Sequence, residues 1–228
     1  MRSAAEPMSL VILTTIELAA ITTILLLILA TPLAWWLARS PRWWKEIPGA
    51  IAALPLVLPP TVLGFYMLVA LSPSSPLMAL LHPFGIRTLA FTFTGLVIGS
   101  LFYSLPFAVQ PLRNSFEAVG SRPLEIAATM GVGPLERFLS VALPLSRRGF
   151  VSAAILVFAH TVGEFGVVLM IGGNIPGQTE VLSTRIYQLV ESMQFGDAHR
   201  IAAGMVTFAF LALFALLLVE RRMTRMMP

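Results

Sequence analysis

Hydrophobic residues gather in this chain into long uninterrupted runs, and the stretches between the runs carry most of the charge. A helix needs about 20 mostly apolar residues to cross the hydrocarbon core of a bilayer. Because the runs do not alternate every second residue, they predict helices and not the strands of a membrane barrel. We expect an all-α polytopic membrane protein with about five spans, and residues 1–228 forming a single transmembrane domain. The expected spans are 10–38, 47–71, 89–109, 150–171 and 201–219.

Composition excludes an ordinary soluble protein. Hydrophobic residues make up 57% of the chain and charged residues 11%, with a mean hydropathy of +0.86, whereas soluble proteins average about 25% charged residues. The chain has no cysteine, and its 3 histidines are far apart without the spacing of metal ligands. No phosphate-binding loop or nucleophile motif is present. We therefore expect no metal, no cofactor, no catalytic residue and no ATP hydrolysis in this chain.

The basic residues indicate an orientation. Most of the 15 lysines and arginines follow the first, third and fifth expected spans. These residues concentrate on the cytoplasmic side of membrane proteins, so we expect the N-terminus outside and the C-terminus inside. The net charge of +4 does not indicate nucleic-acid binding, because the basic residues flank apolar spans and do not form one stripe.

The second expected span carries Pro48, Pro55, Pro59 and Pro60. Each interior proline removes a backbone hydrogen bond and clashes with the preceding turn. Backbone groups freed in lipid need partners from protein or from a wet cavity. A simple kink is one reading of these prolines. We favour the other, in which Pro59 and Pro60 belong to a segment that lines a pathway.

Residues 121–144 form a charged segment in the middle of an oily chain. Ser121 is placed to cap a short helix, and glycine at 131 permits the left-handed turn that ends one. Pro134 is tolerated in the first turn of a second helix, and Pro144 should end it. Two short helices joined by a glycine elbow predict either a docking site for a partner or a loop that folds back on the membrane.

The same segment resembles the "EAA" motif of ABC-importer permeases. In that motif Glu-Ala-Ala is followed, at fixed spacing, by glycine and then by Ile-any-Leu-Pro. The chain departs from the motif at Ile126 and Val141, where it keeps an apolar residue. The resemblance implies that the segment couples the permease to a cytoplasmic ATPase. The implied coupling residues are Glu125, Ile126, Ala127, Gly131, Leu143 and Pro144.

Two further stretches, 54–68 and 163–191, resemble the molybdate permeases within this family, and sulfate permeases share the Gly-Asn-Ile-Pro core at 173–176. The resemblance implies a type I ABC importer permease fold with a cytoplasmic coupling helix. It also implies a homodimer in a bacterial or archaeal inner membrane, in contact with membrane lipid. The implied partners are two copies of a cytoplasmic ABC ATPase and a periplasmic or extracellular oxyanion-binding protein.

The implied function is the import of molybdate by ATP-driven alternating access. A related oxyanion, either tungstate or sulfate and thiosulfate, is the alternative cargo. A stand-alone secondary transporter is a second alternative, although such proteins usually show inverted repeats and this chain shows none.

Ionisable groups inside a span are rare and usually face a cavity or a partner. Glu164 lies within the fourth expected span, between glycines and one turn after His160. We expect it to pair with His160 or to cap backbone amides, and to act in gating more than in contact with an anion. Gln110 and Asn174 are polar groups that could line the pathway.

The expected orientation can be tested by chemical labelling. A cysteine introduced at Ser3 should react in intact cells with a thiol reagent that does not cross the membrane, whereas one at Ser121 or Ser140 should react only after permeabilisation. The chain has no native cysteine, so the label reports the introduced thiol alone. The reverse pattern would contradict both the orientation and a cytoplasmic coupling segment.

Overall fold

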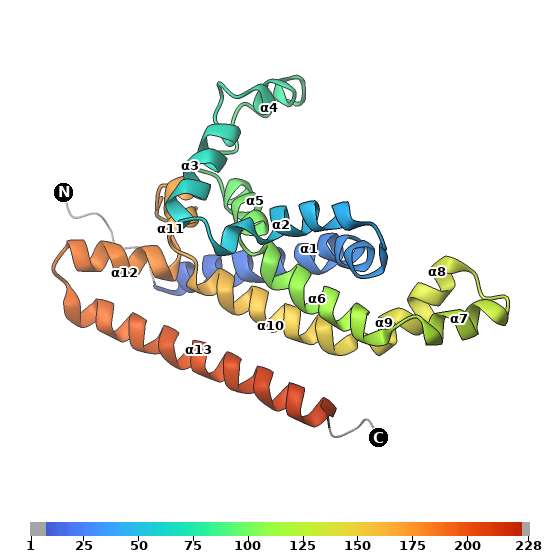
Figure 1. The fold of residues 1–228 in the computed structure, drawn as a ribbon. Coiled ribbons are helices and arrows are strands. Elements are labelled where there is room, and N and C mark those ends of the chain that lie inside the picture. The colour runs from blue at the N-terminus through green and yellow to red at the C-terminus, as the bar shows by residue number, and fades with distance from the viewer. Residues whose placement is uncertain (1–7, 225–228) are drawn as a thin grey trace.

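The computed structural model describes residues 8–224, which are helical with short connections. The positions Arg2, Ser3 and Arg225, which enter the orientation argument, lie outside the described residues. Figure 1 shows the arrangement of the helices. They are α1 (Met8–Arg39), α2 (Glu46–Ala53), α3 (Pro60–Leu71), α4 (Pro76–Ala79), α5 (Phe93–Tyr103), α6 (Leu105–Val119), α7 (Arg122–Thr129), α8 (Pro134–Arg137), α9 (Leu143–Leu145), α10 (Arg147–Gly163), α11 (Gly166–Gly172), α12 (Leu182–Glu191) and α13 (Phe195–Thr224).

The main core lies where α1, α6 and α10 pack against one another. Small residues let the helix backbones approach closely, as is usual in membrane bundles. A Cβ added to Gly149 of α10 would stand 2.4 Å from the Cβ of Ser115 and 2.8 Å from the carbonyl oxygen of Pro111 on α6. The fully buried members of this core include Leu26, Ala30, Ala34, Leu37, Ala108, Leu112, Phe116, Ala153 and Val157.

The first and last expected spans are confirmed as continuous helices, α1 and α13. Three helical stretches among residues 8–224 are long and apolar enough to cross a membrane, and two bent helix pairs raise the number to as many as five. The three stretches are Met8–Arg39, Pro60–Ala79 and Phe195–Val219, and the two bent pairs are Phe93–Tyr103 with Leu105–Val119 and Pro134–Leu145 with Arg147–Gly163.

The third expected span is confirmed only in part. Helix α5 begins at Phe93, the chain bends by 43° between α5 and α6, and α6 continues to Val119. The sequence-based boundary at 109 was too early because α6 is amphipathic: Phe116 is buried in the core, whereas Glu117 is exposed on the other face. A hydropathy average counts the residues of the polar face of α6 together with those of the buried face, so it does not show that the helix continues.

The second and fourth expected spans are wrong as single helices. The prolines interrupt the second one, which divides into α2, a 3-10 turn at Leu54–Leu56 and α3, so the expected break is confirmed. The fourth divides into α10 and α11, because Glu164 has an extended backbone (ψ 129°). Both interruptions lie between apolar segments and not at the surface ends of the bundle.

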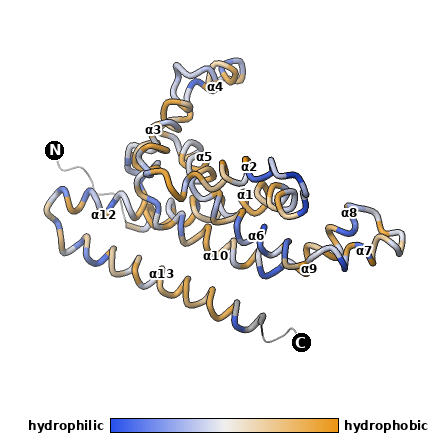
Figure 2. The backbone as a smooth tube through the Cα atoms, in the orientation of Figure 1, coloured by the Kyte–Doolittle hydropathy of each residue, from blue (hydrophilic) through white to orange (hydrophobic). Residues whose placement is uncertain are grey.

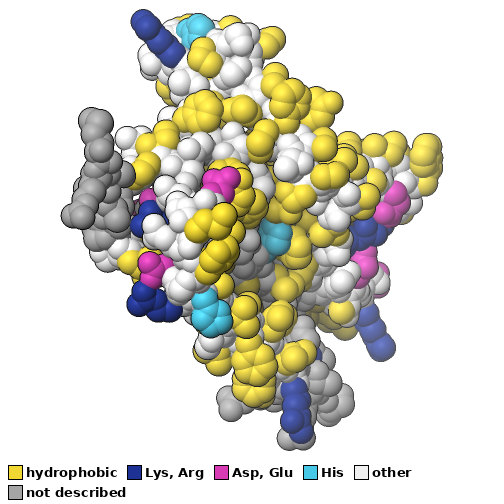
Figure 3. Space-filling view, turned by 90° about the vertical axis from the view of Figure 1, so that its left-hand side faces the viewer, with side chains coloured by type: hydrophobic (Ala, Val, Ile, Leu, Met, Phe, Trp, Pro, Cys, Tyr) yellow, Lys and Arg dark blue, Asp and Glu magenta, His cyan; other side chains and the backbone are white. Residues whose placement is uncertain are grey.

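Helix α13 lies on the outside of the bundle, where it contacts α10 and α12. Its middle is hydrophobic and hydrophilic residues lie toward its ends (Figure 2). Viewed from the α12 end, hydrophobic side chains predominate on the surface and the few charged ones lie mostly near the outline (Figure 3). The start of α1 and α12 lie at one end of the bundle, and α7–α9 and the end of α13 lie at the other (Figure 1).

Candidate functional site

The segment between α6 and α10 contains the predicted glycine elbow. Gly131 has a φ of +80°, in the left-handed region that favours glycine. Its amide donates to the carbonyl of Ala128 at 3.0 Å, and the amide of Val132 donates to that of Ala127 at 3.1 Å. These bonds end α7 in the manner of a glycine C-cap. The predicted elbow and the restart of the helix at Pro134 are therefore confirmed.

One detail of the prediction was wrong. The Ser121 side chain makes no capping hydrogen bond; the Ser121 carbonyl instead accepts from the amides of Leu124 and Glu125, both at 3.0 Å. The second helix passes through a π turn at Phe138–Ala142 and ends at Leu145, one residue after the predicted Pro144, before a bend of 68° into α10. The backbone carbonyl of Ser121 thus serves where its hydroxyl was expected.

The elbow segment, residues 121–144, projects beyond the bundle (Figure 1) and exposes an apolar surface. The side chains of Ile126, Met130, Leu135 and Leu139 are 55%, 77%, 70% and 52% exposed. Ala127, by contrast, is buried beneath them. Clustered apolar side chains of this kind mark interaction surfaces.

The break after α10 is held by serine side chains from two other helices. Glu164 is 2% exposed, and its Oε2 accepts a hydrogen bond of 2.8 Å from Ser100 of α5. Its carbonyl accepts one of 2.5 Å from Ser183 of α12. The predicted pairing with His160 is wrong: His160 Nδ1 and the Ser104 hydroxyl form a 2.9 Å hydrogen bond instead. Glu164 and His160 thus contact successive turns of α5 and not each other.

The break before α3 packs against the break before α11. Pro59 has an extended backbone (ψ 135°) and Pro60 starts α3. A Cβ added to Gly166, the first residue of α11, would lie 2.7 Å from the Cβ of Pro60. A larger residue than glycine would therefore separate the two helix starts. The structure brings Pro59 and Pro60 to this junction, and their part in a pathway stays a prediction.

A cleft of about 490 Å³ runs between α6 and α10. Gln110, predicted as a pathway residue, lies on its wall. Asn174 does not line this cleft; it follows α11 in a left-handed turn with a φ of +52°, a conformation that asparagine tolerates better than most residues. The cleft is lined by Leu56, Pro106, Phe107, Gln110, Pro111, Asn114, Ser115, Ala118, Arg148, Gly149, Ser152 and Leu156.

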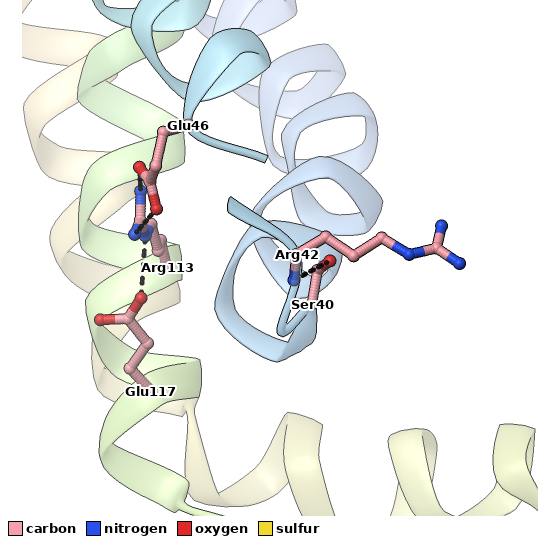
Figure 4. A network of polar contacts seen from close by, with 5 residues as sticks. All are labelled: Ser40, Arg42, Glu46, Arg113 and Glu117. Carbon is pink, nitrogen blue, oxygen red and sulfur yellow. Dashed lines mark hydrogen bonds and ion pairs between the residues drawn. The ribbon is translucent and has the colours of Figure 1, made fainter. Parts of the chain in front are cut away.

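A second cleft, of about 510 Å³, lies on the other side of Gln110 and Asn114, between α6 and α2. Arg113 bridges its walls: it donates to both oxygens of Glu46 at 3.2 Å and to Glu117 at 2.8 Å (Figure 4). The hydrogen bonds from Arg113 hold the pKa of the Glu46 carboxyl below its usual range. This cluster attaches α2 to α6. In residues 8–224 no three histidine or acidic side chains gather where they could hold a metal ion.

Sequence reasoning missed Ser100, Asn114, Arg148 and Ser152. Ser100 was missed because it lies 64 residues from its partner Glu164. Arg148 and Ser152 are spaced by four residues on α10, and Gln110 and Asn114 are spaced likewise on α6, so each pair lies on one helix face. That spacing was the available signal, but only the packing shows that the two faces meet.

Known proteins are similar to this chain in sequence. The family described as "binding-protein-dependent transport system inner membrane component" matches residues 30–226. The chain is 61% identical over 168 residues to the molybdenum transport system permease protein ModB of Azotobacter vinelandii, covering 74% of each chain. It is 30% identical over 176 residues to the sulfate transport system permease protein CysT of Salmonella typhimurium, covering 77% of this chain and 63% of that one.

The fold is also shared with a solved structure. A bacterial alginate ABC transporter, crystallised with an alginate pentasaccharide-bound periplasmic protein, matches with a TM-score of 0.72 at 17% identity, covering 97% of this chain and 80% of that one. At this identity the likeness supports the fold alone. The family match over most of the chain agrees with the motif at 125–144. The chain therefore belongs to the binding-protein-dependent transport system inner membrane components, the permease subunits of ABC importers.

Proposed function

We propose that this chain is the permease subunit through which an ABC importer moves molybdate across the inner membrane, by alternating access driven by ATP on partner subunits. The observation that carries the choice of cargo is the 61% identity to a molybdenum permease, about twice the identity to the sulfate permease. Ligand-driven alternation requires only that ATP changes the relative free energies of two conformations. The chain would supply the two conformations and its partner the free energy.

The proposed contact with the ATPase is the elbow segment at 121–144. Its exposed apolar side chains gather around the left-handed turn at Gly131, and the segment leads within a few residues into α10. A displacement of the elbow can therefore reach the core through α9 and the bend into α10. Glu125, Leu143 and Pro144 belong to the same segment, and we propose that they serve coupling with Ile126 and Ala127.

The proposed assembly is a homodimer of this single-domain subunit in membrane lipid, with two ATPase subunits inside and an oxyanion-binding protein outside. The elbow segment and the end of α13 lie at one end of the bundle (Figure 1). That placement supports a cytoplasmic C-terminus, since the ATPase must reach the elbow from the same side. The N-terminus would then be outside, as the distribution of basic residues predicts.

For Glu164 we propose a gating role. Through its carboxylate and its carbonyl it connects α5 and α12 to the break between α10 and α11. A carboxylate repels an anionic cargo, so a structural position behind the pathway suits it better than contact with the cargo. Pro59, Pro60 and Asn174 lie at backbone breaks or turns, and we propose for them a role in shaping the pathway and not in binding.

Related tetrahedral oxyanions are the alternative cargo, and the 30% identity to a sulfate permease keeps sulfate among them. Cells lacking this chain should regain uptake of labelled molybdate when it is restored together with its ATPase and binding protein. Excess tungstate should compete and excess sulfate should not. Restored uptake of labelled sulfate, with no uptake of molybdate, would replace the proposed cargo with the alternative.

The coupling role predicts the effect of a side chain at Gly131. Gly131→Val places a β-branched residue at a φ of +80°, which costs about 1–3 kcal/mol, although no atom lies within 4 Å of the added Cβ. The variant should insert normally but lose uptake, or hydrolyse ATP without transport. Gly133→Val is the matched control, because Gly133 has a φ of −66° and open space around it. Normal uptake by Gly131→Val would place coupling elsewhere.

The gating role predicts that Glu164→Gln alters the ATPase rate, or its stimulation by the loaded binding protein, in the reconstituted transporter. A change of about 1.4 kcal/mol between the two conformations shifts their ratio tenfold. Ser100→Ala, which removes the hydrogen bond to the carboxylate, should shift the rate in the same direction. Glu17→Gln on the exposed face of α1 should leave it unchanged. A changed preference among anions with an unchanged ATPase rate would put Glu164 in the pathway.

A further inference from the structure

One face of α10 and one face of α6 meet along the cleft of about 490 Å³. Residues four apart lie one above the other on a helix, so Arg148, Ser152 and Leu156 form one ridge. Gln110 and Asn114 lie on the facing ridge of α6. The contact of Gly149 with Ser115 and Pro111 sets the floor between the two ridges.

The lining of the cleft changes from polar to apolar along α10. Arg148 lies near the start of α10, next to the 68° bend that follows the elbow segment. Ser152 is one turn further along and Leu156 another turn beyond it, and Leu56 and Phe107 add apolar side chains to the lining. Phe107 also stacks on His160, with 4.1 Å between ring centroids. The polar part of the cleft is therefore separated by hydrophobic side chains from the buried Ser100–Glu164 pair.

The polar side chains of the cleft have donors to spare. The Ser115 hydroxyl donates to the carbonyl of Ser146, but within residues 8–224 the other polar lining side chains, Gln110, Asn114, Arg148 and Ser152, form no hydrogen bond or ion pair with another side chain. Arg148 is the one charged residue among those described as lining the cleft, and no carboxylate lines it. The nearest acidic cluster, in the adjoining cleft, holds its carboxylates against Arg113. The cleft thus presents positive charge and uncommitted N–H and O–H groups.

These groups match a tetrahedral oxyanion. Guanidinium binds oxyanions through paired N–H donors, while amide and hydroxyl groups supply neutral donors that hold an anion less tightly. The volume lies in the range of small-ligand sites, about 300–1,000 Å³. A site with one cation and several neutral donors suits a dianion that must be bound briefly and then released.

We propose, on the basis of the proposed function, that the α6–α10 cleft is an oxyanion-binding site on the elbow side of the permease. Arg148 is its charged anchor, and Gln110, Asn114 and Ser152 are further donors. Arg148 lies three residues after α9 ends at Leu145. A displacement of the elbow segment that turns the first residues of α10 would move the anchor relative to α6. This connects partner movement to the strength of anion binding.

The test uses the purified complex of permease and ATPase, without the binding protein, and measures equilibrium binding of radiolabelled molybdate. The wild-type complex should bind molybdate in proportion to the permease subunits. Arg148→Gln should weaken binding roughly tenfold or more, because hydrogen bonds that involve a charged group are stronger than those between neutral groups. Arg147→Gln is the matched control: Arg147 is adjacent and exposed but does not line the cleft, and it should bind as the wild type does.

Equal binding by the wild type and by Arg148→Gln would place the anion on another part of the complex and contradict the proposed site. The proposed site would also be contradicted if the wild type bound no molybdate, or if anionic phospholipid alone displaced the bound molybdate. Asn114→Ala should weaken binding by a smaller factor than Arg148→Gln, which supports a shared site. If the wild-type transporter carries molybdate but Arg148→Gln binds and carries it equally well, the proposed binding site is wrong and the proposed function stands. If the wild-type transporter carries no tetrahedral oxyanion, the proposed function fails first.

Discussion

Lipid offers no hydrogen-bond partners, so each interruption of a helix in the apolar part of this chain has to be satisfied by the chain itself. After α10, hydroxyl groups meet part of this requirement: Ser183 donates to the carbonyl of Glu164 and Ser100 to its Oε2, while Oε1 is buried without a hydrogen-bond partner among the described residues. The start of α11 at Gly166 in turn contacts the start of α3 at Pro60. Moving α5 or α12 would leave a polar group of Glu164 without its hydrogen bond. Moving α3 or α11 would break the close contact between their first residues.

The elbow segment is exposed on one side and anchored on the other. Trp35 of α1 packs edge-on against Phe138 of the π turn and against Phe116 of α6, with centroid distances of 5.1 Å and 5.2 Å. Closely packed aromatic rings resist deformation and transmit displacement. The segment is thus joined to α1 and α6 of the main core through side chains, and to α10 through the backbone. A rigid connection of this kind suits a part that has to convey movement.

Local features were predicted well from the sequence and distant partners were not. Gly131 was recognised as the elbow because its left-handed turn depends on neighbouring residues alone, and α1 was recognised because length and hydrophobicity decide a span. The continuation of α6 to Val119 depends on a buried face that no hydropathy average reveals. The partner of Glu164 was wrong because a hydrogen bond across 64 residues depends on how α5 lies beside the break between α10 and α11. The cleft went unseen for the same reason, since each of its walls is an ordinary helix face until the two are brought together.

The packing of α13 bears on how the protein is made. Synthesis delivers α1 well before its main partners α6 and α10, so α1 has to remain stable in lipid without them, which its hydrophobicity on all faces allows. Helix α13 is delivered after α10 and α12, the two helices with which it packs extensively. The core of α1, α6 and α10 can therefore close before α13 leaves the ribosome. Docking of α13 then adds one helix to a finished surface, and no earlier contact has to open to admit it.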